Sequence, residues 1–160
     1  MPAPERLTST LDGDFVVFLI GMRINTPWKL HRWMPIARSM PRMLAELEAH
    51  PEMGMLGGHM WFSRTIILVQ YWRSMDQLMA YATNRDAEHL PVWRDFNQTV
   101  AKTGDVGVWH ETYAVAPGSY ENVYVNMPPF GLGKVGKRMP ATGTMSAARG
   151  RLDAGKHRAT

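Results

Sequence analysis

The sequence predicts an α+β protein with the element order β-α-β-β-α-β, the ferredoxin-like arrangement. Three observations support this order. Residues 14–22 are an apolar strand-like run, residues 28–50 repeat apolar side chains at helical spacing, and residues 55–72 contain two short strands around a tight turn. Two shorter helices, one after Ser74 and one from Pro91, and a last strand at residues 105–115 complete the pattern. Four antiparallel strands then make one sheet, with the helices on one face of it.

The first strand, residues 14–22, is apolar on both of its alternating faces. A strand in a sheet with one wet face alternates apolar and polar residues instead. Because the helices cover only one face, the other face needs a further cover, and a second copy of the chain is the simplest source. The pattern therefore predicts a homodimer in which two sheets face each other, a dimeric α/β barrel with an apolar interior.

The first helix is predicted over residues 28–50 from an apolar stripe at spacings of four and three residues. The stripe consists of Trp33, Ala37, Met40, Leu44 and Leu47. Pro35 and Pro41 interrupt this segment, and proline removes a backbone donor and crowds the preceding turn. We therefore expect a kink or two helical segments, with Ser39 or Met40 near the start of the second.

The next two strands, residues 55–62 and 65–72, are joined by a turn at Ser63–Arg64. Alternation places Met55, Gly57, His59 and Trp61 on one face of the first. Adjacent glycines within a strand mark either a bulge, where a ligand can approach the backbone, or a place where a helix packs closely. Ser74 with Gln77 is a capping-box pattern that begins a short helix.

Pro91 favours the first turn of a further helix, which ends near Gly104. In the last strand, His110 shares a face with Val106, Val108 and Thr112. Trp109, Glu111 and Tyr113 take the opposite face. His110 therefore cannot point the same way as its neighbours in the sequence.

The 160 residues fit one domain with two extensions. We expect an N-terminal arm at 1–13, the ferredoxin-like domain at 14–127 and a basic, Gly/Ala-rich tail at 128–160, with a short added strand at Val123–Val125. The net charge of +4 arises in the tail, which has seven basic residues and one acid, whereas residues 1–127 have a balance of −2. The tail is expected to be loose. No basic stripe of a sequence-specific nucleic-acid reader is present.

Several classes of protein are excluded by composition and motif. The chain has no cysteine, which rules out disulfides, thiolate nucleophiles and cysteine-ligated clusters. The sequence contains no run of 18 apolar residues, so no membrane-spanning helix is predicted. The polar N-terminus does not resemble a signal peptide, and a cytoplasmic location is therefore expected. The phosphate-binding, dinucleotide, zinc-protease and serine-hydrolase motifs are absent.

Three aromatic-rich segments each contain one histidine and one tryptophan. They are residues 57–62 (GGHMWF), residues 81–96 (YATNRDAEHLPVWRDF) and residues 107–113 (GVWHETY). The pairs are His59 with Trp61, His89 with Trp93, and His110 with Trp109. Imidazole among indoles is typical of an apolar small-molecule pocket with a few polar groups. The alternative is that these are core histidines bonded to backbone carbonyls.

His89 precedes the helix that begins at Pro91. The partial positive charge at a helix N-terminus disfavours imidazolium, so a neutral His89 could act as a base or ligate iron; the alternative is a surface cap. Arg23, Asn25 and Trp28 cluster after the first strand. They could bind an anionic or carbonyl group, and the alternative is a solvated turn.

Longer stretches resemble a known family. YWRSMDQLMAYATNRDAEHLPVWRDFNQ, GDVGVWHETYAV and GSYENVYVNMPPFGL, within Asp14–Leu132, resemble small proteins grouped with the monooxygenase of fumagillin biosynthesis. That group is similar to antibiotic-biosynthesis monooxygenases in the dimeric α/β-barrel superfamily. In cofactor-free relatives, the apolar barrel binds an aromatic or polyketide-like substrate and oxygen attacks an activated carbon.

The resemblance implies a small monooxygenase acting on an apolar or aromatic metabolite with O₂ and without a required cofactor. His89, His110 and His59 would be its catalytic groups, with Trp61, Trp93, Trp109, Arg23, Asn25 and Trp28 binding substrate. In haem-binding relatives a histidine on a later helix ligates iron. The alternative is therefore a haem b protein with His89 as axial ligand, although the spacing from Tyr81 is shorter here and Pro91 intervenes. A third hypothesis is a non-catalytic ligand-binding or stress-response module.

Overall fold

The computed structural model describes residues 5–84, 94, 98 and 101–157. The chain forms two compact units. Phe18–Thr112 make the larger unit; Met1–Val17 and Tyr113–Thr160 make the smaller unit. The division into an arm at 1–13, a domain at 14–127 and a tail at 128–160 stays a prediction.

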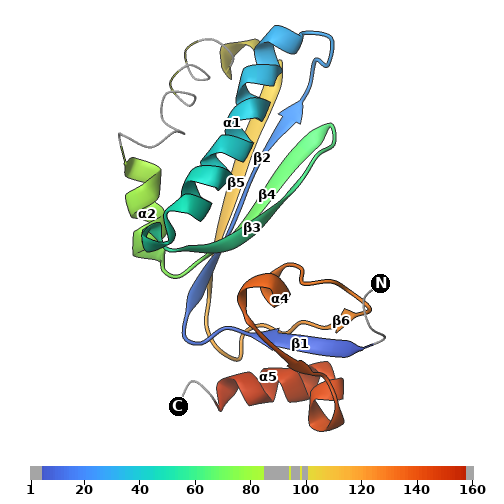
Figure 1. Cartoon of the computed structure of the whole chain (residues 1–160). Helices are drawn as coiled ribbons and strands as arrows, with labels where there is room; N and C mark the ends of the chain where they lie inside the picture. The colour runs from blue at the N-terminus through green and yellow to red at the C-terminus, as the bar shows by residue number, and fades with distance from the viewer. Residues whose placement is uncertain (1–4, 85–93, 95–97, 99–100, 158–160) are drawn as a thin grey trace. The chain divides into compact units, whose positions relative to one another are not determined.

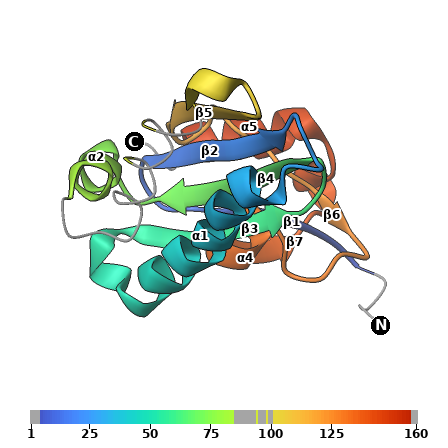
Figure 2. The ribbon, with the colours of Figure 1, turned by 90° about the horizontal axis from the view of Figure 1, so that it is seen from above.

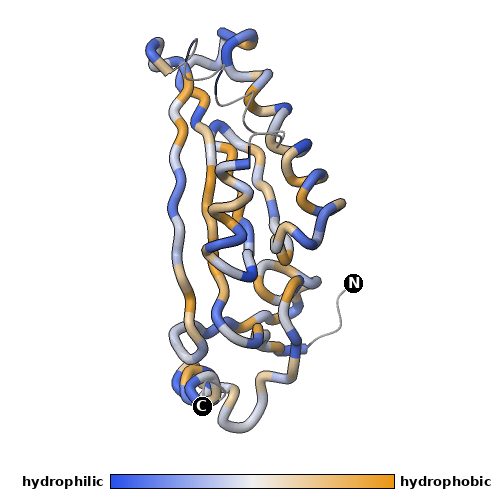
Figure 3. Tube along the Cα trace, turned by 90° about the vertical axis from the view of Figure 1, so that its left-hand side faces the viewer, coloured by the Kyte–Doolittle hydropathy of each residue, from blue (hydrophilic) through white to orange (hydrophobic). Residues whose placement is uncertain are grey.

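The larger unit is built on a four-stranded sheet with the order β3-β4-β2-β5 (Figure 1). The strands are β2 (Phe15–Ile24), β3 (Met55–Trp61), β4 (Thr65–Trp72) and β5 (Val106–Val115). β3 and β4 pair antiparallel. The first strand of the sequence pattern thus lies inside the sheet, and the α+β fold class is confirmed. Figure 3 shows hydrophobic stretches within the larger unit, and the sequence places the longest apolar runs in β2 (FVVFLI) and β4 (IILV).

Helix α1 (Leu30–Ala49) crosses one face of the sheet (Figures 1 and 2). Its predicted stripe is confirmed: Met40 belongs to a buried cluster with Met22, Ile66 and Leu68 of the strands. The expectation of two segments is wrong, because α1 is a single helix with both prolines inside it. Each proline removes one backbone hydrogen bond, but its fixed φ is helical. The apolar contacts of the stripe with the sheet offset that loss.

The hairpin of β3 and β4 contains the predicted bulge, between Met55 and Gly57. Gly57 has φ +155°, which L side chains rarely adopt. Beyond the bulge, His59 pairs with Val69, while before it Met55 pairs with the buried Trp72. The bulge therefore moves Met55 to the helix-covered face, and the prediction that it shares a face with His59 is wrong.

Helix α2 (Met75–Thr83) begins as predicted at Ser74, whose hydroxyl accepts a hydrogen bond from the Gln77 amide at 3.2 Å. The helix predicted from Pro91 falls mostly outside the described residues. Its end is described as a short 3₁₀ turn, η3 (Ala101–Thr103), and Gly104 follows with φ +70°. No helix of the described residues combines the length and apolar character that a membrane span needs.

The smaller unit contains a three-stranded antiparallel sheet, with β1 (Arg6–Thr10) between β6 (Tyr124–Val125) and β7 (Lys137–Pro140). The short strand predicted near Val123–Val125 is confirmed. The unit also contains α4 (Leu132–Val135), η4 (Gly143–Ser146) and α5 (Ala148–Lys156).

The expectation of a loose tail is wrong, because its glycines permit close packing. A Cβ at Gly155 of α5 would lie 2.7 Å from the backbone nitrogen of Gly118. A Cβ at Gly133 would lie 3.0 Å from the ring of Tyr124. Composition that resembles a flexible tail instead allows backbone segments to approach each other.

Candidate functional site

The larger unit holds a cavity of about 400 Å³ between the helix-covered face of its sheet and helices α1 and α2. Its walls are mostly apolar, with three polar side chains from the strands. The described lining consists of Phe18, Ile20, Met43, Gln70, Leu78, Met79, Tyr81, Ala82, His110 and Thr112. A concave apolar cavity with a few polar groups is the usual form of a small-molecule site.

His110 reaches this cavity from β5, and the residue is exposed to solvent. Its ring lies 5.9 Å from the ring of Phe18, tilted by 44°. Neither ring nitrogen forms a hydrogen bond with any residue that the structure describes. Neutral imidazole carries one donor and one acceptor nitrogen. His110 can therefore accept a proton from a bound molecule or donate one to it.

Gln70 reaches the same cavity from β4 and is 4% exposed. The indole nitrogen of Trp72 donates a hydrogen bond to Oε1 of Gln70 at 2.9 Å. The ring of Trp72 lies 5.6 Å from the ring of Tyr81, and the hydroxyl of Tyr81 donates to Oε2 of Glu46 at 3.1 Å. This chain of contacts links β4, α2 and α1 around the cavity.

The sequence analysis did not single out Gln70. A signal was present, since the buried face of β4 consists of Ile66, Leu68, Gln70 and Trp72. A polar residue on an otherwise apolar buried face needs a partner or a function.

His59 and Trp61 lie on the face of the sheet opposite to this cavity. Their rings meet edge to face, with centroids 4.4 Å apart. They pair across to Val69 and Ile67, which alternate with the cavity residue Gln70. The structure therefore does not bring them together with His110.

Trp109 also lies on that opposite face. A Cβ at Gly21 would lie 2.7 Å from its indole nitrogen, so Gly21 makes room for the ring. The predicted alternation of Trp109 and His110 is confirmed. Of the remaining histidine–tryptophan pair, both His89 and Trp93 lie outside the described residues.

The predicted cluster after β2 forms local contacts. Arg23 donates to the hydroxyl of Thr65 at 3.0 Å, and the Asn25 amide donates to the carbonyl oxygen of Gly104 at 3.0 Å. Trp28 is 79% exposed. None of the three lines the cavity. Their exposure supports the alternative of a solvated turn.

Charge is sparse at the cavity. Its described lining includes no Lys, Arg, Asp or Glu, and among the described residues no three His, Asp or Glu side chains form a metal-binding group. An ion pair between Lys29 and Asp105 lies where β5 begins. Hydrogen bonds from Lys29 (2.9 Å) and Thr26 (2.8 Å) lower the pKa of Asp105.

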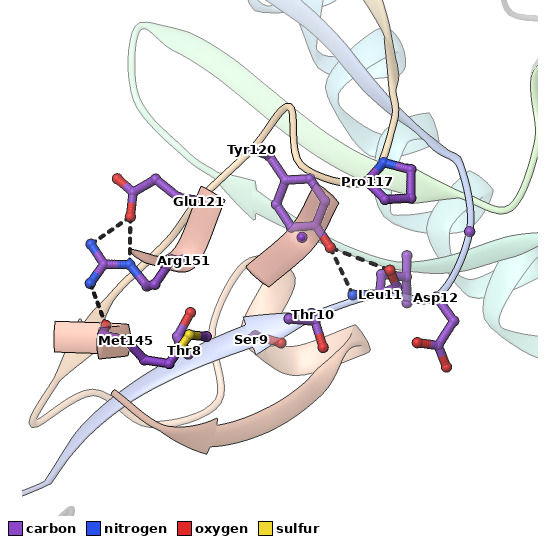
Figure 4. A pocket seen from close by; sticks show the side chains of 12 residues that line it. Thr8, Ser9, Thr10, Leu11, Asp12, Pro117, Tyr120, Glu121, Met145 and Arg151 are labelled. Atoms are coloured by element: carbon purple, nitrogen blue, oxygen red, sulfur yellow. Dashed lines mark hydrogen bonds and ion pairs between the residues drawn. The ribbon is translucent and has the colours of Figure 1, made fainter. Parts of the chain in front are cut away.

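The smaller unit has its own cavity, of about 250 Å³ (Figure 4). Arg151 lines this cavity. Its guanidinium forms an ion pair with Glu121 at 2.6 Å and donates hydrogen bonds to the carbonyl oxygens of Met145 and Ser146. Tyr120 bonds the backbone of Leu11. Because these polar groups already form hydrogen bonds with one another and with the backbone, they stabilise the unit and do not indicate a ligand site.

The sequence matches a model of the monooxygenase af470-like family over residues 15–132. It is also similar to monooxygenase af470 of Aspergillus fumigatus, with 30% identity over 133 residues. That alignment covers 76% of this chain and 46% of the relative. The chain thus spans less than half the length of this curated relative.

The fold is similar to that of two solved aldoxime dehydratases. One, co-crystallised with butyraldoxime, has a TM-score of 0.68 at 15% identity, covering 85% of this chain and 41% of that one. The other has a TM-score of 0.67 at 15% identity, covering 85% and 42%. At this identity the likeness concerns the fold, which agrees with the sheet order above. On the match over residues 15–132, the chain belongs to the monooxygenase af470-like family.

Proposed function

We propose that this protein is a small monooxygenase that acts on an apolar or aromatic metabolite in the cavity of its larger unit. The observation that supports this most is His110, an imidazole without a hydrogen-bond partner among the described residues, on the wall of an apolar cavity. The family of the chain agrees with the class of reaction.

In this proposal His110 removes a proton from an activated methylene carbon of the substrate. The resulting carbanion reduces O₂, one oxygen atom becomes a carbonyl on that carbon, and the other leaves as water. The overall change is R₂CH₂ + O₂ → R₂C=O + H₂O, so the substrate supplies all the electrons. His110 is exposed, so the reacting carbon would stand at the open side of the cavity, with the apolar side chains of Phe18, Ile20 and Met43 in contact with the rest of the substrate.

The proposal includes a homodimer. On the sheet face opposite to the cavity, Ile67 and Val69 are half-buried beside the exposed His59 and Trp61. A second copy would cover this apolar face.

Haem b with His89 as axial ligand is the alternative proposal. The described cavity offers the imidazole of His110 but no Lys or Arg for the two haem propionates. Since His89 lies outside the described residues, this alternative rests on the sequence. A Soret band in the purified protein, or after titration with haem, would favour it over the cofactor-free enzyme.

Anthrone, which has an acidic methylene opposite a ring carbonyl, is a suitable probe of the proposed reaction. We expect the protein to consume one O₂ per anthrone and to form anthraquinone faster than a protein-free control. His110→Ala should lower the turnover number by about 10²-fold, the usual contribution of a general base. His31→Ala, an exposed histidine of α1, is the control.

A rate in the wild type no higher than in His110→Ala would contradict the proposal. It would favour the non-catalytic ligand-binding module instead. Circular dichroism and native mass of both variants separate lost chemistry from lost fold or dimer.

A further inference from the structure

We propose that Gln70 determines which ligands the cavity accepts, by donating a hydrogen bond from its amide nitrogen. The ligand is then an apolar molecule that carries an acceptor oxygen: a carbonyl, an enolate or a phenolate. This inference rests on the proposed function, since it assigns a ligand class to the same cavity.

The contact with Trp72 decides which end of the Gln70 amide faces the cavity. An indole N–H can only donate, so it must meet the amide oxygen, and it does so at 2.9 Å. The amide nitrogen is left facing away from Trp72. It forms no hydrogen bond with any of the residues that the structure describes.

A ligand that fills the cavity displaces water from this donor and must replace the hydrogen bond. The whole residue is only 4% exposed and lines the cavity. A buried donor without a partner costs about 1–3 kcal/mol. An oxygen acceptor on the ligand removes that cost, whereas a hydrocarbon of the same shape leaves it in place.

The amide is also held in its orientation. Trp72 is completely buried and packs at 5.6 Å from Tyr81, which is anchored to Glu46 of α1. Turning the amide would leave the indole donor of Trp72 without its acceptor. Gln70 is therefore a preorganised donor, with little freedom to present its oxygen to the ligand instead.

Gln70 is on β4 and His110 on β5, with β2 between them, and both side chains line the cavity. A ligand whose oxygen meets Gln70 can therefore present a second atom to His110. In the proposed reaction that second atom is the activated carbon.

Two probe ligands of one shape test the inference: 1-indanone, which has a carbonyl oxygen, and indane, which has none. Isothermal titration calorimetry of the full chain should give a dissociation constant about tenfold lower for 1-indanone, the value of one neutral hydrogen bond. Ionised Gln70→Glu keeps an acceptor for Trp72 but has no donor, so all titrations are made at about pH 9, well above the usual range of a carboxyl group. Its preference for 1-indanone should vanish or reverse.

Gln70→Leu removes both groups and should bind the two probes equally; Gln70→Glu keeps the test valid if the leucine variant does not fold. Asn126→Asp, the same amide-to-acid change at an exposed residue outside the cavity, is the matched control and should keep the wild-type ratio.

Equal affinity of the wild type for both probes would overturn the role of Gln70 and leave the cavity as a ligand site. Retention of the tenfold ratio in Gln70→Glu would also overturn it. Failure of both probes to bind the wild type would contradict the proposed cavity function itself.

Discussion

The two units of this protein bury polar and apolar side chains in different proportions. The larger unit is held mainly by an apolar cluster, in which Met22, Met40, Ile66 and Leu68 join α1 to the sheet. The smaller unit buries as many polar as apolar side chains: Thr8, Ser9, Thr10 and Arg151 beside Phe15, Val16, Leu132 and Ala141. The contrast teaches that satisfied hydrogen bonds carry a larger share of the burial in the smaller unit, whereas apolar area removed from water dominates in the larger one.

Asn122 illustrates how the smaller unit satisfies its polar groups. Its side-chain oxygen accepts from the Ser9 amide at 2.7 Å, and its nitrogen donates to the Ser9 carbonyl at 2.8 Å. Strand β6 pairs only with Arg6 and Leu7 of β1. The side-chain amide of Asn122 thus makes the two hydrogen bonds to the Ser9 backbone that a residue of a neighbouring strand would make.

The largest effect is expected from Leu68→Ala in the larger unit. Leu68 is fully buried, so the change removes transfer free energy and leaves a cavity, lowering the free energy of unfolding by about 4 kcal/mol. Urea denaturation measures it. Leu30→Ala, at a residue 51% exposed, is the control and should change it by less than about 0.5 kcal/mol. Equal losses in the two variants would mean that the apolar cluster does not hold the unit.

The next effect is expected from Arg151→Met in the smaller unit. It leaves Glu121 and the carbonyl oxygens of Met145 and Ser146 without their cation, at a cost of about 3 kcal/mol. Arg149→Met removes a pair with Asp153 at a residue whose side chain is 82% exposed, and should cost less than about 0.5 kcal/mol.

Hydrogen exchange locates the damage of Arg151→Met. Faster exchange should be concentrated in β1 and α5, with the amides of β4 less affected. Exchange that accelerates equally in all three elements would contradict a polar unit with its own stabilising contacts.

A smaller, pH-dependent effect is expected from Asp105 in the larger unit. Lys29 and Thr26 lower its folded pKa, so its contribution is present above the unfolded value, near 3.9, and is lost as the pH falls through the folded value. Asp105→Asn should therefore lower the free energy of unfolding at pH 7. The difference between the variant and the wild type should shrink as the pH falls below about 4, because Asp105 then becomes protonated. Urea midpoints at pH 7, 4 and 3 measure it; a difference independent of pH would refute the assignment.

The sequence predicted those elements whose residues repeat with a structural period. The stripe of α1 and the alternation of β4 are apolar on one side, and the cap at Ser74 has a local chemical cause. It did not predict β1, because Thr8, Ser9 and Thr10 are polar and are buried only through partners more than 100 residues away.

For the candidate site, too, the sequence predicted the features that depend on local alternation and missed those that depend on packing between distant elements. Alternation within β5 correctly separated His110 from Trp109, since both lie on one strand. Convergence of His59 with His110 on one site was not borne out in the described larger unit, where the two lie on opposite faces of the sheet. Gln70 was missed because its meaning depends on Trp72 and on helices that pack over β4.

The central claim is that a ligand binds in the cavity of the larger unit, beside His110. Proton–nitrogen spectra of the histidine rings, recorded during titration with 1-indanone, test it most directly. The account predicts that the ring signals of His110 move with saturation. Those of His31, His50 and His157, which are exposed like His110 but do not line the cavity, stay unchanged. Saturable binding that leaves the His110 signals in place would contradict it.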